Sequence, residues 1–277
     1  MSATRALPVG WGTASAMVVA SLAALALALW PFLGGGGANP FASSALLMVL
    51  LPLMMLLVLS QVLEGGMDAK ALALLGVLAA AIAAVRPLGS GVGGVETVFF
   101  LLILGGRAFG PGFGFALGGV SLLASALLTG GVGPWLGMQM ACSSWIAAGA
   151  GLLPRRIGGR PGGRGEVVVL AVYGIAASYL FGALMNLWFW PALAGSGALA
   201  SGIGFDPAAS AGANWRHFLV FTLVTSTTSW DTVRAVTCAA ALLLLGRPIL
   251  ALLRRAGAKA AFAPSEPAGQ RPNEPAN

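Results

Sequence analysis

The stretch VETVFFLLILGGRAFGPGFGFALGGVSLLASALL, residues 95–128, is almost wholly apolar, yet glycine recurs throughout it. Within it, Gly114, Gly118, Ser121 and Ser125 are spaced by 4, 3 and 4 residues, which places them on one face of a helix. Lipid provides no hydrophobic force that drives helices together, so small residues on one face let two backbones approach closely. The stretch therefore predicts helices that pack tightly inside a membrane.

The composition of the whole chain supports a membrane location. Of its 277 residues, 58% are hydrophobic and only 8% are charged, whereas a soluble domain is about 25% charged. Several uncharged apolar runs approach or exceed about 18 residues, the length that a helix needs to cross about 30 Å of hydrocarbon. We predict an all-α polytopic membrane protein.

Eight apolar runs, separated by glycine, proline or charged residues, are candidate spans. They cover residues 11–33, 41–63, 68–85, 95–106, 112–128, 134–153, 166–190 and 230–253. The first run is preferred as a retained helix because it is long for a signal peptide and lacks a convincing cleavage site. We predict two N-terminal helices in residues 1–67, a six-helix core in 68–256 and a disordered tail in 257–277.

The charge distribution predicts the topology. The formal net charge of +7 suggests nucleic acid, but the arginines fall mainly at the ends of apolar runs, which the positive-inside rule explains better. Placing both termini in the cytoplasm leaves only three of the 15 basic residues outside, namely Arg86, Arg216 and Arg234. We predict a bacterial inner-membrane protein with cytoplasmic termini and no nucleic-acid partner.

Motifs for catalysis are nearly absent from the sequence. No G-x-x-x-x-G-K-[ST] motif occurs, so the chain is not expected to hydrolyse ATP. The G-x-G-x-x-G match at Gly89, Gly91 and Gly94 lies between two spans, where it predicts a flexible loop and no dinucleotide site. The single histidine, His217, is expected in an exposed loop, and Cys142 and Cys238 lie inside apolar runs. We therefore expect no cofactor and no metal site.

The informative polar residues gather at the predicted outer end. The candidate binding residues are Arg86, Glu96, Trp135, Gln139, Asn186, Trp188, Trp230, Asp231 and Arg234. Ionisable groups at membrane depth are costly and usually face a cavity or one another. Asp231 and Arg234 are expected to form an i,i+3 ion pair, with Asp231 near a helix N-cap, and Glu96 is an equally plausible partner of Arg86. An outward-facing pocket for an amphiphilic small molecule follows.

Residues 68–254 resemble the substrate-binding S component of energy-coupling factor (ECF) vitamin transporters. The resemblance rests on residues 95–128 with the Phe109-Gly110-Pro111 turn, on TGGVGPW and on a last helix that ends in arginines. It implies a six-helix domain that captures a vitamin in its outer half and docks on a transmembrane coupling subunit and two cytoplasmic ATPases. Its docking face would be the small residues Ala69, Ala73, Gly76 and Ala80, and its ligand loops would be residues 86–95, 129–135 and 191–229.

The substrate is less well defined than the family. The two extra helices, residues 93–115 and SWDTVRA look most like the branch associated with cobalamin, while thiamin or its precursor and riboflavin remain open. Many members carry an acidic residue in the third core helix, where this chain has Ser121 and Ser125. Three other classes compete. They are an intramembrane enzyme that uses Glu96 or Asp231 as a base, a proton-coupled secondary transporter, against which no inverted repeat is found, and a structural membrane anchor, against which the outward cluster of polar groups argues.

Overall fold

The computed structural model describes residues 11–29, 32, 69–89, 93–154, 162–193 and 202–260. The predicted second helix, residues 41–63, lies outside the described residues. Of the predicted tail, residues 257–260 continue the last helix, and the remainder also lies outside them.

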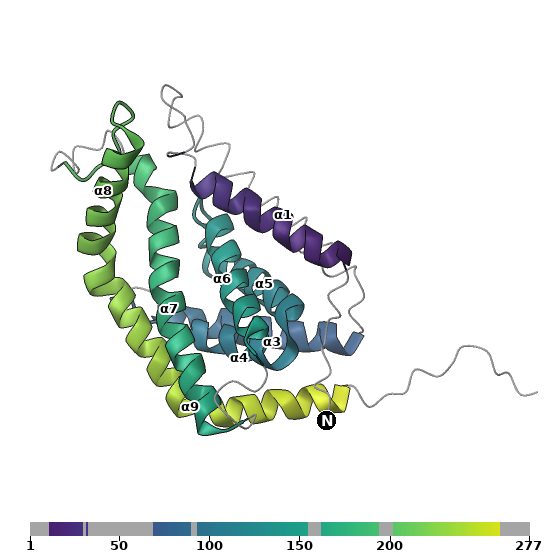
Figure 1. Ribbon diagram of the computed structural model, residues 1–277. Helices are drawn as coiled ribbons and strands as arrows, with labels where there is room; N and C mark the ends of the chain where they lie inside the picture. The colour runs from purple at the N-terminus through teal and green to yellow at the C-terminus, as the bar shows by residue number, and fades with distance from the viewer. Residues whose placement is uncertain are drawn as a thin grey trace, which may run out of the picture.

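Every element in the described ranges is helical. They are α1 (Trp11–Ala28), α3 (Ala69–Gly89), α4 (Phe99–Phe109), α5 (Pro111–Thr129), α6 (Leu136–Leu152), α7 (Arg164–Phe189), the 3-10 turn η2 (Trp190–Leu193), α8 (Ala211–Thr222), the π-helical η4 (Leu223–Asp231) and α9 (Thr232–Ala260) (Figure 1). Four helical stretches are long and apolar enough to cross a membrane: Ala69–Gly89, Pro111–Thr129, Arg164–Phe189 and Ala211–Lys259. The described chain is thus a helical protein with membrane-type helices, although it does not display the predicted arrangement of six core helices plus two.

Helices α5 and α6 pack with their backbones in close contact, through the predicted face of small residues on α5. A Cβ at Gly114 would lie 2.6 Å from the Ala147 carbonyl oxygen, and a Cβ at Gly118 would overlap the backbone at Ser144. Ser121 and Ser125 on the same face are fully buried. This stripe therefore serves packing within the bundle, as small-residue faces do in lipid.

Gly110 and Pro111 separate α4 from α5. Gly110 adopts φ +98°, in the left-handed region that favours glycine, and Pro111 starts the next helix, where its missing N–H has no partner to lose. The 11 residues of α4 extend only about 16 Å. This helix is therefore too short to cross a bilayer alone.

The prediction of an outer loop over residues 191–229 is wrong for residues 211–229. Residues 211–231 form α8 and η4 and run without a break into α9. The Ser210 side chain caps α8 by accepting a hydrogen bond from the Ala213 N–H. The apolar run 218–224 in this segment is short and lies between Trp215, Arg216 and His217 on one side and several threonines and serines on the other, so it was not recognised as a helix.

One buried carboxylate joins three helices, at the C-terminal end of α4, the N-terminal end of α7 and the C-terminal half of α9. Glu166 is fully buried and accepts hydrogen bonds from Arg107 Nε at 2.7 Å and from Arg254 Nη2 at 2.7 Å. The Gly162 N–H donates to its second oxygen, and Arg107 also donates to the Leu153 carbonyl. The cluster therefore ties the ends of α4, α6, α7 and α9 together.

Candidate functional site

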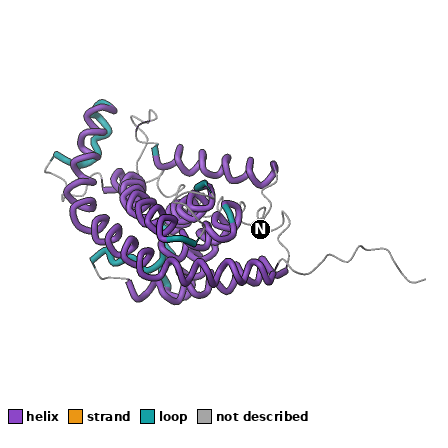
Figure 2. Tube along the Cα trace, turned by 60° about the horizontal axis from the view of Figure 1, so that its bottom comes forward, coloured by secondary structure: helices purple, strands orange, loops and turns teal. Residues whose placement is uncertain are grey.

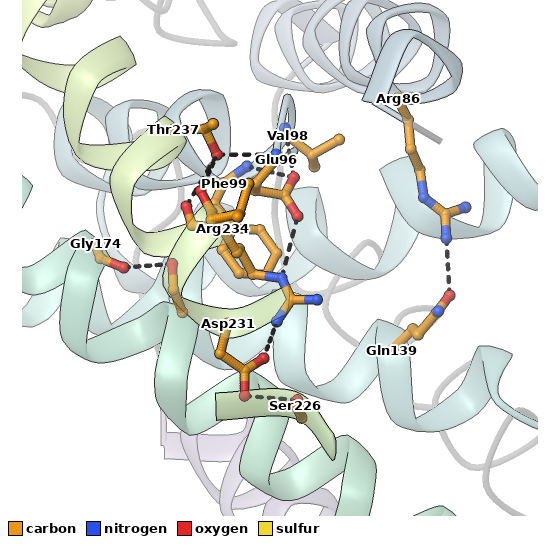
Figure 3. Close-up of polar contacts among 12 residues, drawn as sticks. Arg86, Glu96, Val98, Phe99, Gln139, Gly174, Ser226, Asp231, Arg234 and Thr237 are labelled. Atoms are coloured by element: carbon orange, nitrogen blue, oxygen red, sulfur yellow. Dashed lines mark hydrogen bonds and ion pairs between the residues drawn. The ribbon is translucent and has the colours of Figure 1, made fainter. Parts of the chain in front are cut away.

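A cavity of about 180 Å³ lies where the end of α3, the 93–98 connection, α6, α7 and the start of α9 meet. Its polar lining comprises Arg86, Glu96, Thr97, Gln139, Ser143 and Arg234, and its apolar lining includes Val98, Phe99, Leu122, Phe181 and Trp230. Figure 3 shows the charged groups as two sets, Glu96 with Arg234 and Asp231 on one side and Arg86 with Gln139 on the other. We refer to this space as the charged cavity.

Glu96 is held at the start of α4 by backbone donors. Its Oε1 accepts hydrogen bonds from the Val98 N–H at 2.7 Å and the Phe99 N–H at 3.3 Å. Its own N–H donates to Thr237 Oγ1 on α9. Burial raises the pKa of the Glu96 carboxyl, while the two backbone N–H groups, Arg234 and Arg86 act in the opposite direction. In the α3–α4 connection, burial thus disfavours the charged form of the Glu96 carboxyl, while its hydrogen bonds and the two arginines favour that form.

Arg234 connects Glu96 to a carboxylate deeper in the bundle. Its Nε lies 3.8 Å from Glu96 Oε2, and its Nη1 donates to Asp231 Oδ1. The guanidinium also lies 5.0 Å from the centroid of the Phe181 ring, a cation–π distance. The predicted i,i+3 ion pair is confirmed, and Glu96 pairs with Arg234 within ion-pair distance.

The predicted position of Asp231 near a helix N-cap is wrong. Asp231 ends the π-helical segment inside a continuous helix, with only 1% of its surface exposed. Ser226 Oγ donates to its Oδ2 at 2.7 Å, a contact across five residues that the wider π turn favours. Long π segments are rare and often mark functional sites.

Arg86 defines the other side of the cavity. Its Nη2 donates to Gln139 Oε1 at 2.9 Å and its Nη1 lies 3.4 Å from Ser125 Oγ. Arg86 therefore joins α3 to α5 and α6 while its charge faces the same space as Glu96 and Arg234. Ser125 thus belongs to the small-residue face of α5 and also contacts Arg86, a partner that its spacing in the sequence did not predict.

Two glycines are necessary for this geometry. A Cβ at Gly182 on α7 would overlap the Asp231 carboxylate, and a Cβ at Gly94 would lie 2.5 Å from the Trp230 carbonyl oxygen. Gly94 also has φ +88°. Gly89 and Gly94 line the cavity, so the loop that the glycine pattern predicted contributes directly to the site; its residues 90–92 lie outside the described ranges.

Five of the nine predicted binding residues line the charged cavity, and four do not. Those that line it are Arg86, Glu96, Gln139, Trp230 and Arg234. Asp231 does not line the cavity but forms an ion pair with Arg234, which does. Trp135, Asn186 and Trp188 are also outside the cavity lining. Trp135 is 42% exposed and bonds to the Gly131 carbonyl, and Trp188 packs on the core.

Trp190 belongs to an aromatic cluster that packs against α8. Trp190 is fully buried and has ring contacts with Phe32, Phe205 and Phe218, and its Nε1 donates to the Ile203 carbonyl. His217 is on α8 and half-buried, so the expected exposed loop position is wrong. These aromatic rings therefore form a cluster that packs α8, and only Trp230 belongs to the charged cavity.

The predicted docking residues lie on the outer face of α3. Ala69, Ala73, Gly76 and Ala80 are exposed, and no atom of the described residues lies within 4 Å of a Cβ built at Gly76. Ala83, the next small residue along this line, is buried. Within the described ranges, no other helix thus covers the small residues 69–80 of α3, in contrast to those of α5.

Searches against models of known protein families, curated proteins and solved structures found no match. The class therefore rests on the fold and the site alone: an all-helical described chain with four membrane-type helical stretches and a charged cavity between helices. Among the described residues, no three His, Cys, Asp or Glu side chains are grouped to hold a metal ion.

Proposed function

We propose that the chain is the substrate-binding subunit of an ECF-type vitamin importer, which captures its ligand in the charged cavity. The observation that carries this proposal is the convergence of Arg86, Glu96 and Arg234 on one cavity lined also by Trp230. Ligand sites typically combine aromatic and apolar walls with a few convergent polar groups. A ligand with hydrogen-bonding groups and an aromatic ring matches this lining.

The size of the cavity favours a small ligand. Sites for drug-sized molecules measure about 300–1,000 Å³, whereas the charged cavity measures about 180 Å³. A corrinoid is much larger than a drug-sized molecule, so cobalamin would require α3 and α9 to separate. Thiamin, its pyrimidine precursor or another small heteroaromatic vitamin is therefore the preferred substrate, and cobalamin the second choice.

The partners belong to the same proposal. A coupling subunit in the membrane would dock on the open face of α3, where Ala73 and Gly76 allow a second helix to approach closely. Two cytoplasmic ATPases would supply the energy. The subunit itself would bind its ligand without ATP.

Ligand identification is the direct test. We expect the purified full chain to retain or bind one member of a vitamin panel without ATP, detected by absorption spectrum and mass analysis. Arg86→Ala and Arg234→Ala should weaken binding about 10–100-fold, because each removes a charged hydrogen-bond donor from the cavity. Arg216→Ala is the matched control, since Arg216 is exposed and lies outside the cavity lining. Equal binding by all three variants would exclude this cavity as the site.

Docking can be separated from binding. We expect Gly76→Leu to leave ligand binding unchanged, because Gly76 lies outside the cavity lining and no described residue occupies the space above it. The same change should reduce ATP-dependent uptake by at least about tenfold in vesicles containing the coupling subunit and ATPases, since a bulky side chain prevents close helix approach. Val77→Leu, at an exposed neighbouring position, serves as the control. Normal uptake by the Gly76 variant would contradict docking at this face.

A proton-coupled secondary transporter is the second candidate. Glu96 favours it, because its carboxyl lines the charged cavity 3.8 Å from Arg234, and an ionisable group that faces a cavity in a membrane protein can relay protons during transport. Proton flux through vesicles containing the chain alone, together with a failure to bind any vitamin, would support this candidate against the first.

A further inference from the structure

A second groove, at the opposite end of the bundle, measures about 480 Å³ and lies between α7 and α9. Apolar residues of both helices form its walls, among them Val168 and Leu244, which are 51% and 76% exposed. Arg164 and Arg247 line the same groove, and none of the described residues that line it is acidic. The groove thus combines exposed hydrocarbon with two positive charges.

The two arginines differ from the other arginines that line or close the bundle. Arg107 and Arg254 bond to Glu166, and Arg234 bonds to Asp231. Within the part of the chain that the structure describes, no ion pair or hydrogen bond involves Arg164 or Arg247, and both are exposed. Two guanidinium groups beside an apolar groove provide a site for an anion.

The position of the groove places it where a bilayer has its headgroups. Pro248 lies inside α9 and interrupts its hydrogen bonding, and Figure 1 shows the yellow C-terminal part of α9 turning across the end of the bundle. That part carries Arg254, Arg255 and Lys259. Figure 2 shows the same helix running along one side of the molecule after the turn. Basic residues beyond an apolar span mark the membrane surface, so Arg164 and Arg247 lie near the phosphate level.

We propose that this groove binds one anionic phospholipid, with its phosphate between Arg164 and Arg247 and an acyl chain along Val168 and Leu244. The charge of the groove selects an anionic headgroup, because a zwitterionic lipid carries an ammonium group that two guanidinium groups repel. Basic pockets between membrane helices on the cytoplasmic side hold anionic headgroups by the same electrostatics. The site is separate from the charged cavity and does not depend on the proposed transport role.

The test is native mass spectrometry of the full chain in neutral detergent, titrated with dioleoyl-phosphatidylglycerol or dioleoyl-phosphatidylcholine. We expect one phosphatidylglycerol to bind at concentrations where phosphatidylcholine does not. The double variant Arg164→Gln/Arg247→Gln should bind phosphatidylglycerol about 30-fold more weakly. The control Arg255→Gln/Lys259→Gln removes the same charge from exposed positions of the same helix outside the groove lining, and should bind normally.

Three further measurements serve as controls. Circular dichroism verifies that each variant is folded, and Arg164→Glu/Arg247→Glu should reverse the preference so that phosphatidylcholine is retained over phosphatidylglycerol. Glycerol phosphate, which has the headgroup chemistry without acyl chains, should not displace the bound lipid at equal concentration. Equal retention of both lipids by the wild type, unchanged binding by the Arg164→Gln/Arg247→Gln variant, or displacement by glycerol phosphate would each overturn the proposal.

Discussion

Replacement of Glu166 by alanine is expected to destabilise the protein by about 3–5 kcal/mol, because it leaves buried positive charge without its partner. Glu166 is fully buried and accepts hydrogen bonds from Arg107 and Arg254, which come from different helices. Arg107 has only 4% of its side chain exposed, so water cannot replace the lost carboxylate. The loss should lower the midpoint of thermal unfolding by roughly 10 °C.

Thermal unfolding of the detergent-solubilised chain measures this effect. Glu166→Gln, which keeps the shape and hydrogen-bonding oxygen but removes the charge, should lie between the wild type and the alanine variant. Arg255→Ala removes an exposed charge from the same end of α9 and should change the midpoint by less than about 2 °C. An alanine variant as stable as the wild type would show that this cluster does not hold the helices together.

The double change Gly106→Ala/Gly118→Ala should destabilise the bundle by about 3–6 kcal/mol, since each added methyl group meets backbone atoms that cannot rotate away. A Cβ at Gly106 would overlap the Ala147 carbonyl, and a Cβ at Gly118 would overlap the backbone of Ser144. Helix α6 would have to move away from α4 and α5. We expect most of the variant to aggregate during purification, with the remainder unfolding at a much lower temperature.

Gly76→Ala is the matched control for this prediction. Gly76 is also inside an apolar helix, but none of the residues that the structure describes has an atom within 4 Å of its added Cβ. Alanine has the higher helix propensity, so this change should be neutral or stabilise the chain by up to about 1 kcal/mol. Size-exclusion profiles and unfolding midpoints of the two variants separate close packing from a general effect of replacing glycine. Equal behaviour of the two would contradict close packing of α6 against α4 and α5.

Local sequence features were sufficient to predict most helices. The predicted spans 68–85, 112–128, 134–153 and 166–190 agree with α3, α5, α6 and α7 to within a few residues. Apolar runs and glycine or proline breaks are local properties, so they can be recognised one segment at a time. The helix in segment 211–231 was not predicted because the segment contains many polar residues. Its stability comes from its continuation into α9 and from aromatic packing of Phe218 on Trp190, and neither is a local property of the segment.

The candidate site was predictable only in part. Arg86, Glu96, Gln139, Trp230 and Arg234 were grouped because their helices were expected to end on the same side, and they do line one cavity. The contributions of Gly182 and Ser125 depend on which helix faces meet, and no spacing within one helix reveals that. Trp188 was grouped with the binding residues for its residue type, whereas it packs on the core.

The amino-acid sequence by itself determined that this chain forms apolar helices with tightly packing small faces, because hydropathy and residue size act within a single segment. Only the tertiary structure decided which charges meet: Glu166 with Arg107 and Arg254 at one end, and Glu96 with Arg234 at the other. These pairs join residues 59, 88 and 138 positions apart in the chain. Ion pairing depends on distance in space, which becomes defined only when the helices have packed.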